Sequence, residues 1–133
     1  MTGEEMTGFR LSTRSRRRLE GVHEDLKRVV EAAILVTSVD FLVLEGVRTL
    51  ERQKALYAAG ATRTMNSRHL TGHAVDLGAW VDGEVMWRWP LYLKIAAAMK
   101  AAGKRLDVKI VCGADWKKFP DGPHFELSRD DYP

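Results

Sequence analysis

Apolar residues recur at helical spacing in several stretches of the chain. The clearest stripe lies between Glu24 and Thr37 and consists of Leu26, Val29, Val30, Ala33 and Ile34. This spacing puts all five side chains on one face and predicts a helix that packs against a sheet.

Three other stretches also have helical signals, and the predicted helices are Arg14–Leu19, Leu50–Ala59 and Leu91–Ala102. Ser12 and Thr49 precede the first two and are suitable N-cap residues. Pro90 suits the first turn of the third helix, and Gly103 is predicted to end it.

Short apolar runs between these helices predict strands at 40–47, Ala74–Val81, Glu84–Trp87, Asp107–Val111 and His124–Leu127. Asp82-Gly83 is a two-residue hairpin turn between the second and third strands. Helices followed by hairpin-type strands favour an α+β fold with a small, mainly antiparallel sheet and helices on one side. Residues 1–133 are expected to form a single domain with loose tails at 1–10 and 129–133.

Two polar segments stand apart from this core-forming pattern. Ser67–Leu77 reads SRHLTGHAVDL, and Asp121–Leu127 reads DGPHFEL. Two histidines and one carboxylate are a common ligand set for a catalytic zinc with an open fourth position. Asp121, three residues before His124, could then serve as a general base.

The two segments resemble those of the zinc D-Ala-D-Ala carboxypeptidase family, and more closely those of the L-alanyl-D-glutamate peptidases used as bacteriophage endolysins. The shared patterns are S-x-H-x-x-G-x-A-x-D and a distant D-x-x-H-F-E. The matching positions are Ser67, His69, Gly72, Ala74, Asp76, Asp121 and His124. The resemblance runs from about Leu11 to Leu127 and implies the family's fold, a small sheet flanked by helices.

The resemblance also implies roles for individual residues. The zinc ligands it implies are His69, Asp76 and His124. Asp121 corresponds to the base, with Glu126 as the first alternative. Arg48, in a G-x-R-x-x-x-x-Q setting with Gly46 and Gln53, corresponds to the group that faces the oxyanion or a substrate carboxylate.

Two further residues have supporting roles in this interpretation. Ser67 is expected to contact a ligand or the substrate. Asp115 is expected to orient a ligand histidine, because metal-bound histidines usually donate their other N–H to an oxygen.

His73 is an alternative ligand, since it follows His69 by four positions as in the helical H-E-x-x-H motif. Gly72 between the histidines and Leu70 in place of the motif's glutamate oppose that assignment. We therefore expect His73 to be a partly exposed non-ligand. His23 precedes an apolar helix and is expected to be a cap or a surface residue.

Composition narrows the possible compartments and partners. The chain of 133 residues is 45% hydrophobic, enough for a core, yet has no apolar run near the roughly 20 residues that span a bilayer. Residues 1–9 lack an apolar segment, so we expect no secretory signal peptide and synthesis in the cytoplasm. The single cysteine, Cys112, excludes an internal disulfide and is expected to be a buried thiol.

The net charge of +3 is unevenly distributed. The arginines that cluster near the N-terminus are Arg10, Arg14, Arg16, Arg17 and Arg18. They could attract a polyanion, such as nucleic acid, anionic lipid or cell wall, or they could form an ordinary solvated helix face. No nucleic-acid-binding motif or interleaved aromatic residue accompanies them.

The combined hypothesis is a monomeric zinc peptidase that cleaves the L-Ala–D-Glu bond of peptidoglycan stem peptides for host cell lysis. Without a signal peptide, it would reach the wall in the periplasm only after a holin opens the membrane, with neither membrane insertion nor nucleic-acid binding. One alternative is a D-Ala-D-Ala carboxypeptidase or dipeptidase of cell-wall metabolism, and another is a non-catalytic wall-binding module. Asp121 argues against the module, because binding alone needs no base. An aspartate where the D-Ala-D-Ala enzymes generally have glutamate favours the L-Ala–D-Glu bond by resemblance.

Overall fold

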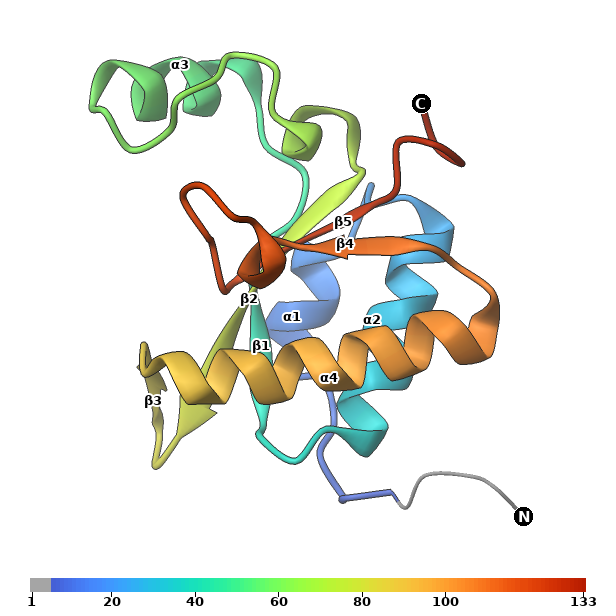
Figure 1. Ribbon diagram of the computed structural model, residues 1–133. Coiled ribbons are helices and arrows are strands. Elements are labelled where there is room, and N and C mark those ends of the chain that lie inside the picture. The colour runs from blue at the N-terminus through green and yellow to red at the C-terminus, as the bar shows by residue number, and fades with distance from the viewer. Residues whose placement is uncertain (1–5) are drawn as a thin grey trace.

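The computed structural model describes residues 6–133 and shows helices packed against a small sheet (Figure 1). The helices are α1 (Thr13–Arg18), α2 (Glu24–Val36), α3 (Leu50–Ala58) and α4 (Trp89–Leu106), with 3₁₀ turns η1 (Arg68–Thr71) and η2 (Gly113–Asp115). The strands are β1 (Phe41–Glu45), β2 (Ala74–Val81), β3 (Glu84–Met86), β4 (Ile110–Cys112) and β5 (His124–Leu127). The predicted α+β class is confirmed.

The sheet is antiparallel at every strand pair of the described residues. Its order is β1-β2-β5-β4, and β3 pairs with β2. The turn between β2 and β3 has positive φ at both Asp82 (52°) and Gly83 (82°), as the predicted two-residue hairpin requires. The register places Asp76 of β2 directly opposite His124 of β5.

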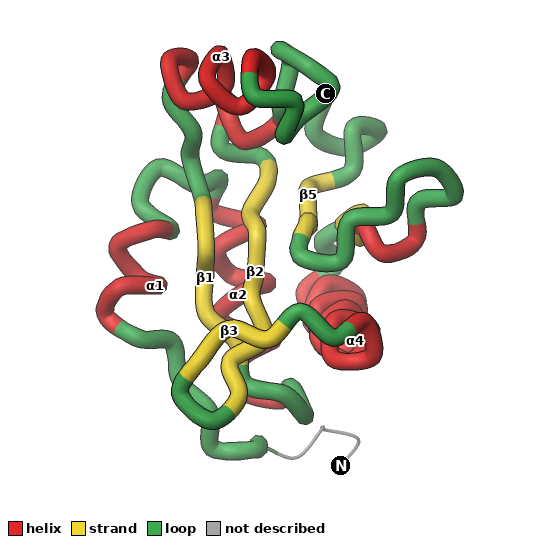
Figure 2. Tube along the Cα trace, turned by 90° about the vertical axis from the view of Figure 1, so that its left-hand side faces the viewer, coloured by secondary structure: helices red, strands yellow, loops and turns green. Residues whose placement is uncertain are grey.

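Alternation along the strands gives the sheet two different faces. The inner face carries Phe41, Val43, Val75, Leu77, Ala79, Phe125 and Leu127, which belong to one hydrophobic core with α2 and α4. The outer face carries Leu42, Leu44, Asp76, Gly78, Trp80, His124 and Glu126. Figure 2 shows α2 behind β1 and β2, with α4 beside them, so these two helices cover one side, as predicted.

Helix α1 lies along the edge of the sheet at β1. The buried Ser15 accepts a hydrogen bond from the Val43 N–H at 2.9 Å, and Arg18 donates to the Val43 carbonyl at 2.9 Å. Ser12 caps the helix, as predicted, by accepting from the Ser15 N–H. The helix therefore satisfies edge groups of β1 that would otherwise offer a pairing site to another chain.

The predicted end of α4 is wrong. The helix continues through Gly103 to Leu106. A Cβ at position 103 would lie 2.8 Å from the Val108 carbonyl oxygen, so this glycine allows a close contact and does not end the helix. Asp107 ends the helix instead, in the left-handed conformation at φ 58°. As a result, β4 begins at Ile110 rather than at Asp107.

Both expected tails are attached to the domain where the structure describes them, while residues 1–5 lie outside the described range. The Thr7 hydroxyl donates to the Thr37 carbonyl at 2.8 Å. The Tyr132 hydroxyl donates to Asp25 at 2.6 Å, and Arg68 donates to the Tyr132 carbonyl at 2.8 Å. Between residues 6 and 133, none of the helices has both the length and the apolar character needed to cross a membrane.

Candidate metal and active site

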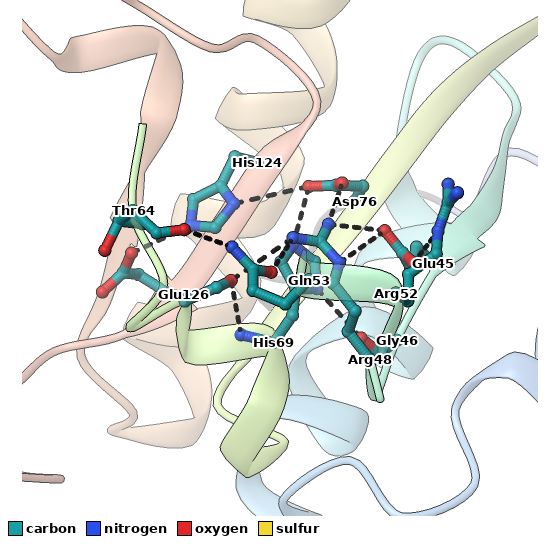
Figure 3. Close-up of polar contacts among 11 residues, drawn as sticks. Glu45, Gly46, Arg48, Arg52, Gln53, Thr64, His69, Asp76, His124 and Glu126 are labelled. Atoms are coloured by element: carbon teal, nitrogen blue, oxygen red, sulfur yellow. Dashed lines mark hydrogen bonds and ion pairs between the residues drawn. The ribbon is translucent and has the colours of Figure 1, made fainter. Parts of the chain in front are cut away.

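Three of the predicted site residues converge at the outer face of the sheet. His69 of η1, Asp76 of β2 and His124 of β5 each offer one donor atom, and these atoms all lie within 4.8 Å of one another. Asp76 Oδ1 is 3.2 Å from His69 Nε2 and 3.4 Å from His124 Nδ1 (Figure 3). Two nitrogens and one oxygen grouped in this way could hold a metal ion and leave a position open.

Local structure explains how η1 and β2 bring these donors together. Ser67 caps η1 by accepting a hydrogen bond from the His69 N–H at 3.2 Å. Gly72 then reverses the chain with φ 77°, and a Cβ there would lie 2.6 Å from the Gly21 carbonyl oxygen. The glycine of the first motif is therefore needed for both its conformation and its close packing.

The outer nitrogen of each histidine has an oxygen partner. His69 Nδ1 is 2.9 Å from the Gly46 carbonyl, which can only accept, so this nitrogen carries a hydrogen and Nε2 is the ring nitrogen directed at Asp76. His124 Nε2 is 2.8 Å from Glu126 Oε1, so its Nδ1 faces Asp76. Such contacts orient the rings of metal-binding histidines.

The structure places Asp115 away from the ligand histidines, contrary to our expectation. Its exposed carboxylate pairs with Lys100 Nζ at 2.8 Å, on the side of α4. Glu126 instead holds His124, because residues two apart on a strand point to the same face. That period-two pattern was available in the sequence of β5. The same contact holds Glu126 against His124 Nε2, the nitrogen that faces away from Asp76. Glu126 is therefore poorly placed to act as the base at the site.

The free site is already arranged as a charged cluster. Burial would raise the pKa of Asp76, but hydrogen bonds with His124 and His69 hold it well below the usual range. Burial would lower the pKa of His124, but its hydrogen bonds with Asp76 and Glu126 outweigh this and raise the pKa to about 9. A bound cation would replace the proton that His124 carries in the free protein.

Asp121 and Arg48 flank this cluster. Asp121 lies in the loop before β5, where its N–H donates to the Gly113 carbonyl at 2.9 Å. Partial burial and the nearby charge of Asp76 raise the pKa of Asp121, which suits a group that takes up a proton.

Arg48 follows β1, and its side chain is only 9% exposed. The guanidinium donates to Glu45 and, at 2.8 Å, to Gln53, and it lies 3.9 Å from Asp76 Oδ2. The buried Gln53 in turn donates to the Thr64 carbonyl. These contacts fix the Arg48 guanidinium beside the cluster, and Nη2 is the nitrogen that lies toward Asp76.

A groove of about 640 Å³ opens above these residues. One wall comes from α3 and the loop after it, and the other from the loop between η2 and β5. The Arg63 guanidinium lies 3.7 Å above the Phe119 ring and joins the two walls, and the Trp116 ring lies 5.0 Å from His124. The sequence offered no local signal for this pairing, because both partners lie in loops.

The remaining histidines are outside the cluster. His73 contacts the Thr71 hydroxyl at 2.7 Å, and its ring lies 5.6 Å from His23. His23 caps α2 by accepting from the Asp25 N–H at 3.1 Å, which confirms the prediction of a cap. Cys112 is buried, as predicted, and burial raises its thiol pKa to about 11.

The fold and this group of residues define the class of the protein: a small α+β domain with a two-histidine, one-carboxylate site that could hold a metal ion. The family model described as phage L-alanyl-D-glutamate peptidase matches residues 6–130. The chain belongs to this family.

Individual relatives agree with this assignment. The L-alanyl-D-glutamate peptidase of Escherichia phage T5 is 29% identical over 128 residues, which cover 93% of each chain. The crystal structure of the Serratia marcescens L-Ala D-Glu endopeptidase ChiX has a TM-score of 0.90 and 43% identity, covering 96% of both chains. The D,D-dipeptidase VanXYg, at 19% identity and a TM-score of 0.57 over 80% of this chain and 50% of that one, shares the fold alone.

Proposed function

We propose that this chain hydrolyses the L-Ala–D-Glu bond of peptidoglycan stem peptides. The observation that carries the proposal is the convergence of His69, Asp76 and His124 beside Asp121 in one open groove. The similarity to enzymes named for this bond over nearly the whole chain supports the choice of substrate.

The metal in this proposal is a single zinc ion held by His69 Nε2, His124 Nδ1 and a carboxylate oxygen of Asp76. The set has nitrogen and oxygen donors and no thiolate, and it is short of the four protein ligands usual in structural zinc sites. When bound, zinc acts as a Lewis acid and makes water a nucleophile near neutral pH.

Asp121 is the proposed general base, which accepts the proton of the attacking water and returns it to the leaving amine of D-glutamate. Its raised pKa and its position on the groove support this role. Arg48 is proposed to face the developing oxyanion or a substrate carboxylate. Ser67, which bonds the His69 backbone and lies 3.5 Å from the Arg48 guanidinium, is proposed to keep both in place.

The proposed biological setting is host cell lysis by a single-domain monomer that reaches the periplasmic wall through a holin-opened membrane. The phage origin of the similar T5 peptidase supports the proposed role in lysis. A wall-metabolism role is the second candidate, because a bacterial protein, the peptidoglycan L-alanyl-D-glutamate endopeptidase CwlK of Bacillus subtilis, is 27% identical over 117 residues, which cover 74% of this chain and 66% of CwlK.

Digestion of purified sacculi followed by mass spectrometry tests the bond. We expect stem peptides that begin at D-glutamate, with L-alanine left on the glycan. Release of only terminal D-alanine would instead identify a D-Ala-D-Ala carboxypeptidase, and the absence of any zinc-dependent product would favour a binding module.

A further inference from the structure

A second cavity, of about 550 Å³, lies between α1 and the β2–β3 hairpin on the same outer face of the sheet as the metal ligands. Its lining includes Trp80, which follows Asp76 by four positions on β2. At 3.3 Å per residue these two positions are about 13 Å apart along the strand. A polymer lying across this face would therefore meet both sites.

The chemistry of the second cavity combines an apolar floor with a cationic rim. The floor consists of Leu42, Leu44, Trp80 and Val85, and the rim carries Arg10, Arg14 and Arg18. All three arginines are exposed, and within residues 6–133 none of them forms an ion pair. Asp40 is the one acidic residue of the described lining, so the rim keeps a positive excess.

We propose that the second cavity is an auxiliary site for a carboxylate-bearing stem peptide of the wall polymer, other than the stem being cut. This inference rests on the proposed function. Stem peptides have free carboxylates beside small apolar side chains, which match an arginine rim over an apolar floor. Arginine is the side chain best suited to planar, bidentate recognition of carboxylates.

The shape of the cavity favours a peptide over a membrane. A membrane surface is met by apolar side chains that protrude toward the lipid. Here Leu42 and Leu44 are half-buried at the bottom of a hollow, and the arginines stand around it. An extended peptide fits a hollow of this kind, with its carboxylates at the rim.

The consequence is bivalent attachment to the wall. While one stem occupies the metal groove, a neighbouring stem in the second cavity raises the effective concentration of enzyme at the polymer. An isolated muropeptide has no neighbouring stem, so the second cavity contributes nothing to its cleavage. The site should thus affect binding to sacculi and leave the hydrolysis of small fragments unchanged.

The test compares two double variants that remove the same charge from the same region. Arg10→Gln with Arg14→Gln alters the rim, whereas Arg16→Gln with Arg17→Gln alters exposed arginines outside the lining. Binding to purified sacculi is measured by co-sedimentation in an Asp121→Asn background, which limits digestion. We expect the rim pair to weaken binding about tenfold and the control pair less than about twofold.

Equal losses in the two pairs would show diffuse charge attraction and overturn the proposal. Tighter binding to anionic phospholipid vesicles or to duplex DNA than to sacculi, with the same dependence on the rim, would also overturn it. Cleavage of a soluble disaccharide-tripeptide is measured separately with the rim pair in the otherwise unaltered chain, and kcat/KM should be unchanged. If the unaltered chain fails to cleave that fragment, the proposed function is wrong. The difference in sacculus binding between the rim pair and the control pair tests the second cavity independently of cleavage.

Discussion

Asp121 lies close enough to the proposed metal ligands for their charges to influence its pKa, yet its carboxylate is not among the grouped donor atoms. Asp121→Asn should therefore retain zinc while turnover falls by roughly 10²–10⁴, because an amide has the same shape but cannot accept the proton. Metal analysis and muropeptide kinetics on one preparation check this. Near-normal turnover would place the base elsewhere.

Glu126 and Asp115 form a matched pair of carboxylates with different surroundings. Glu126→Ala removes the oxygen that orients His124 and should weaken zinc binding by about 10–100-fold. Asp115→Ala removes only an exposed pair with Lys100 and should leave zinc affinity unchanged. Competition with a chelator measures both. If the two substitutions weakened zinc binding equally, the structural assignment of Glu126 would be contradicted. If only Asp115→Ala weakened it, Asp115 would be the residue that orients a ligand histidine, as the sequence predicted.

The raised pKa of His124 predicts how zinc binding depends on pH. With a free-protein pKa of about 9, His124 is protonated at pH 7, and zinc must displace that proton. Affinity should then rise about tenfold per pH unit up to about pH 9 and fall as pH decreases, because the protonated ring cannot bind. Calorimetry in buffers of different ionisation enthalpy should detect about one proton released at pH 7. No proton release would mean that His124 is neutral in the free protein.

At the scale of elements, the contact between α1 and β1 depends on one buried hydroxyl. Ser15→Ala would leave the Val43 N–H without its partner and should lower the free energy of unfolding by about 1–3 kcal/mol. Thr13→Ala, at an exposed position of the same helix, is the control and should change it little. Urea unfolding measures both. Equal effects would mean that α1 contributes through helix propensity rather than through the edge of β1.

Individual helices and turns also show which sequence patterns predict the structure correctly and which do not. The stripe of α2 and the hairpin at Asp82-Gly83 are local signals, and both were predicted correctly. The end of α4 was not, because glycine at position 103 reports a close approach of the Val108 carbonyl rather than a helix stop. A helical glycine looks the same in the sequence whether it ends a helix or makes room for another segment.

At the scale of the whole molecule, the proposed ligands connect the neighbouring segments η1 and β2 with β5, which lies far from both in the chain. Zinc at 100 times its Kd should stabilise the folded state by about 2.7 kcal/mol, which raises Tm by roughly 10 °C. His69→Ala should abolish this shift, and His73→Ala should leave it intact, because His73 lies outside the group. Thermal unfolding with and without zinc checks the prediction. A shift that survives His69→Ala would reject the ligand set.

The sequence by itself predicted the class of fold and the three residues that meet at the candidate metal site. Both depend on short-range information: apolar periodicity sets the helices and strands, and the two motifs preserve ligand type and spacing. The assignment of His69 over His73 also followed from neighbours in the sequence, Gly72 and Leu70.

Only the tertiary structure decided which groups surround those ligands. Asp115 pairs with Lys100 rather than with a ligand histidine, the outer nitrogen of His69 meets the Gly46 carbonyl, and Arg63 reaches Phe119 across the groove. The second cavity likewise joins arginines near residue 14 to Trp80. Such contacts depend on the register of β2 against β1 and β5 and on the paths of loops, which are set by long-range packing and leave no periodic signal in the chain.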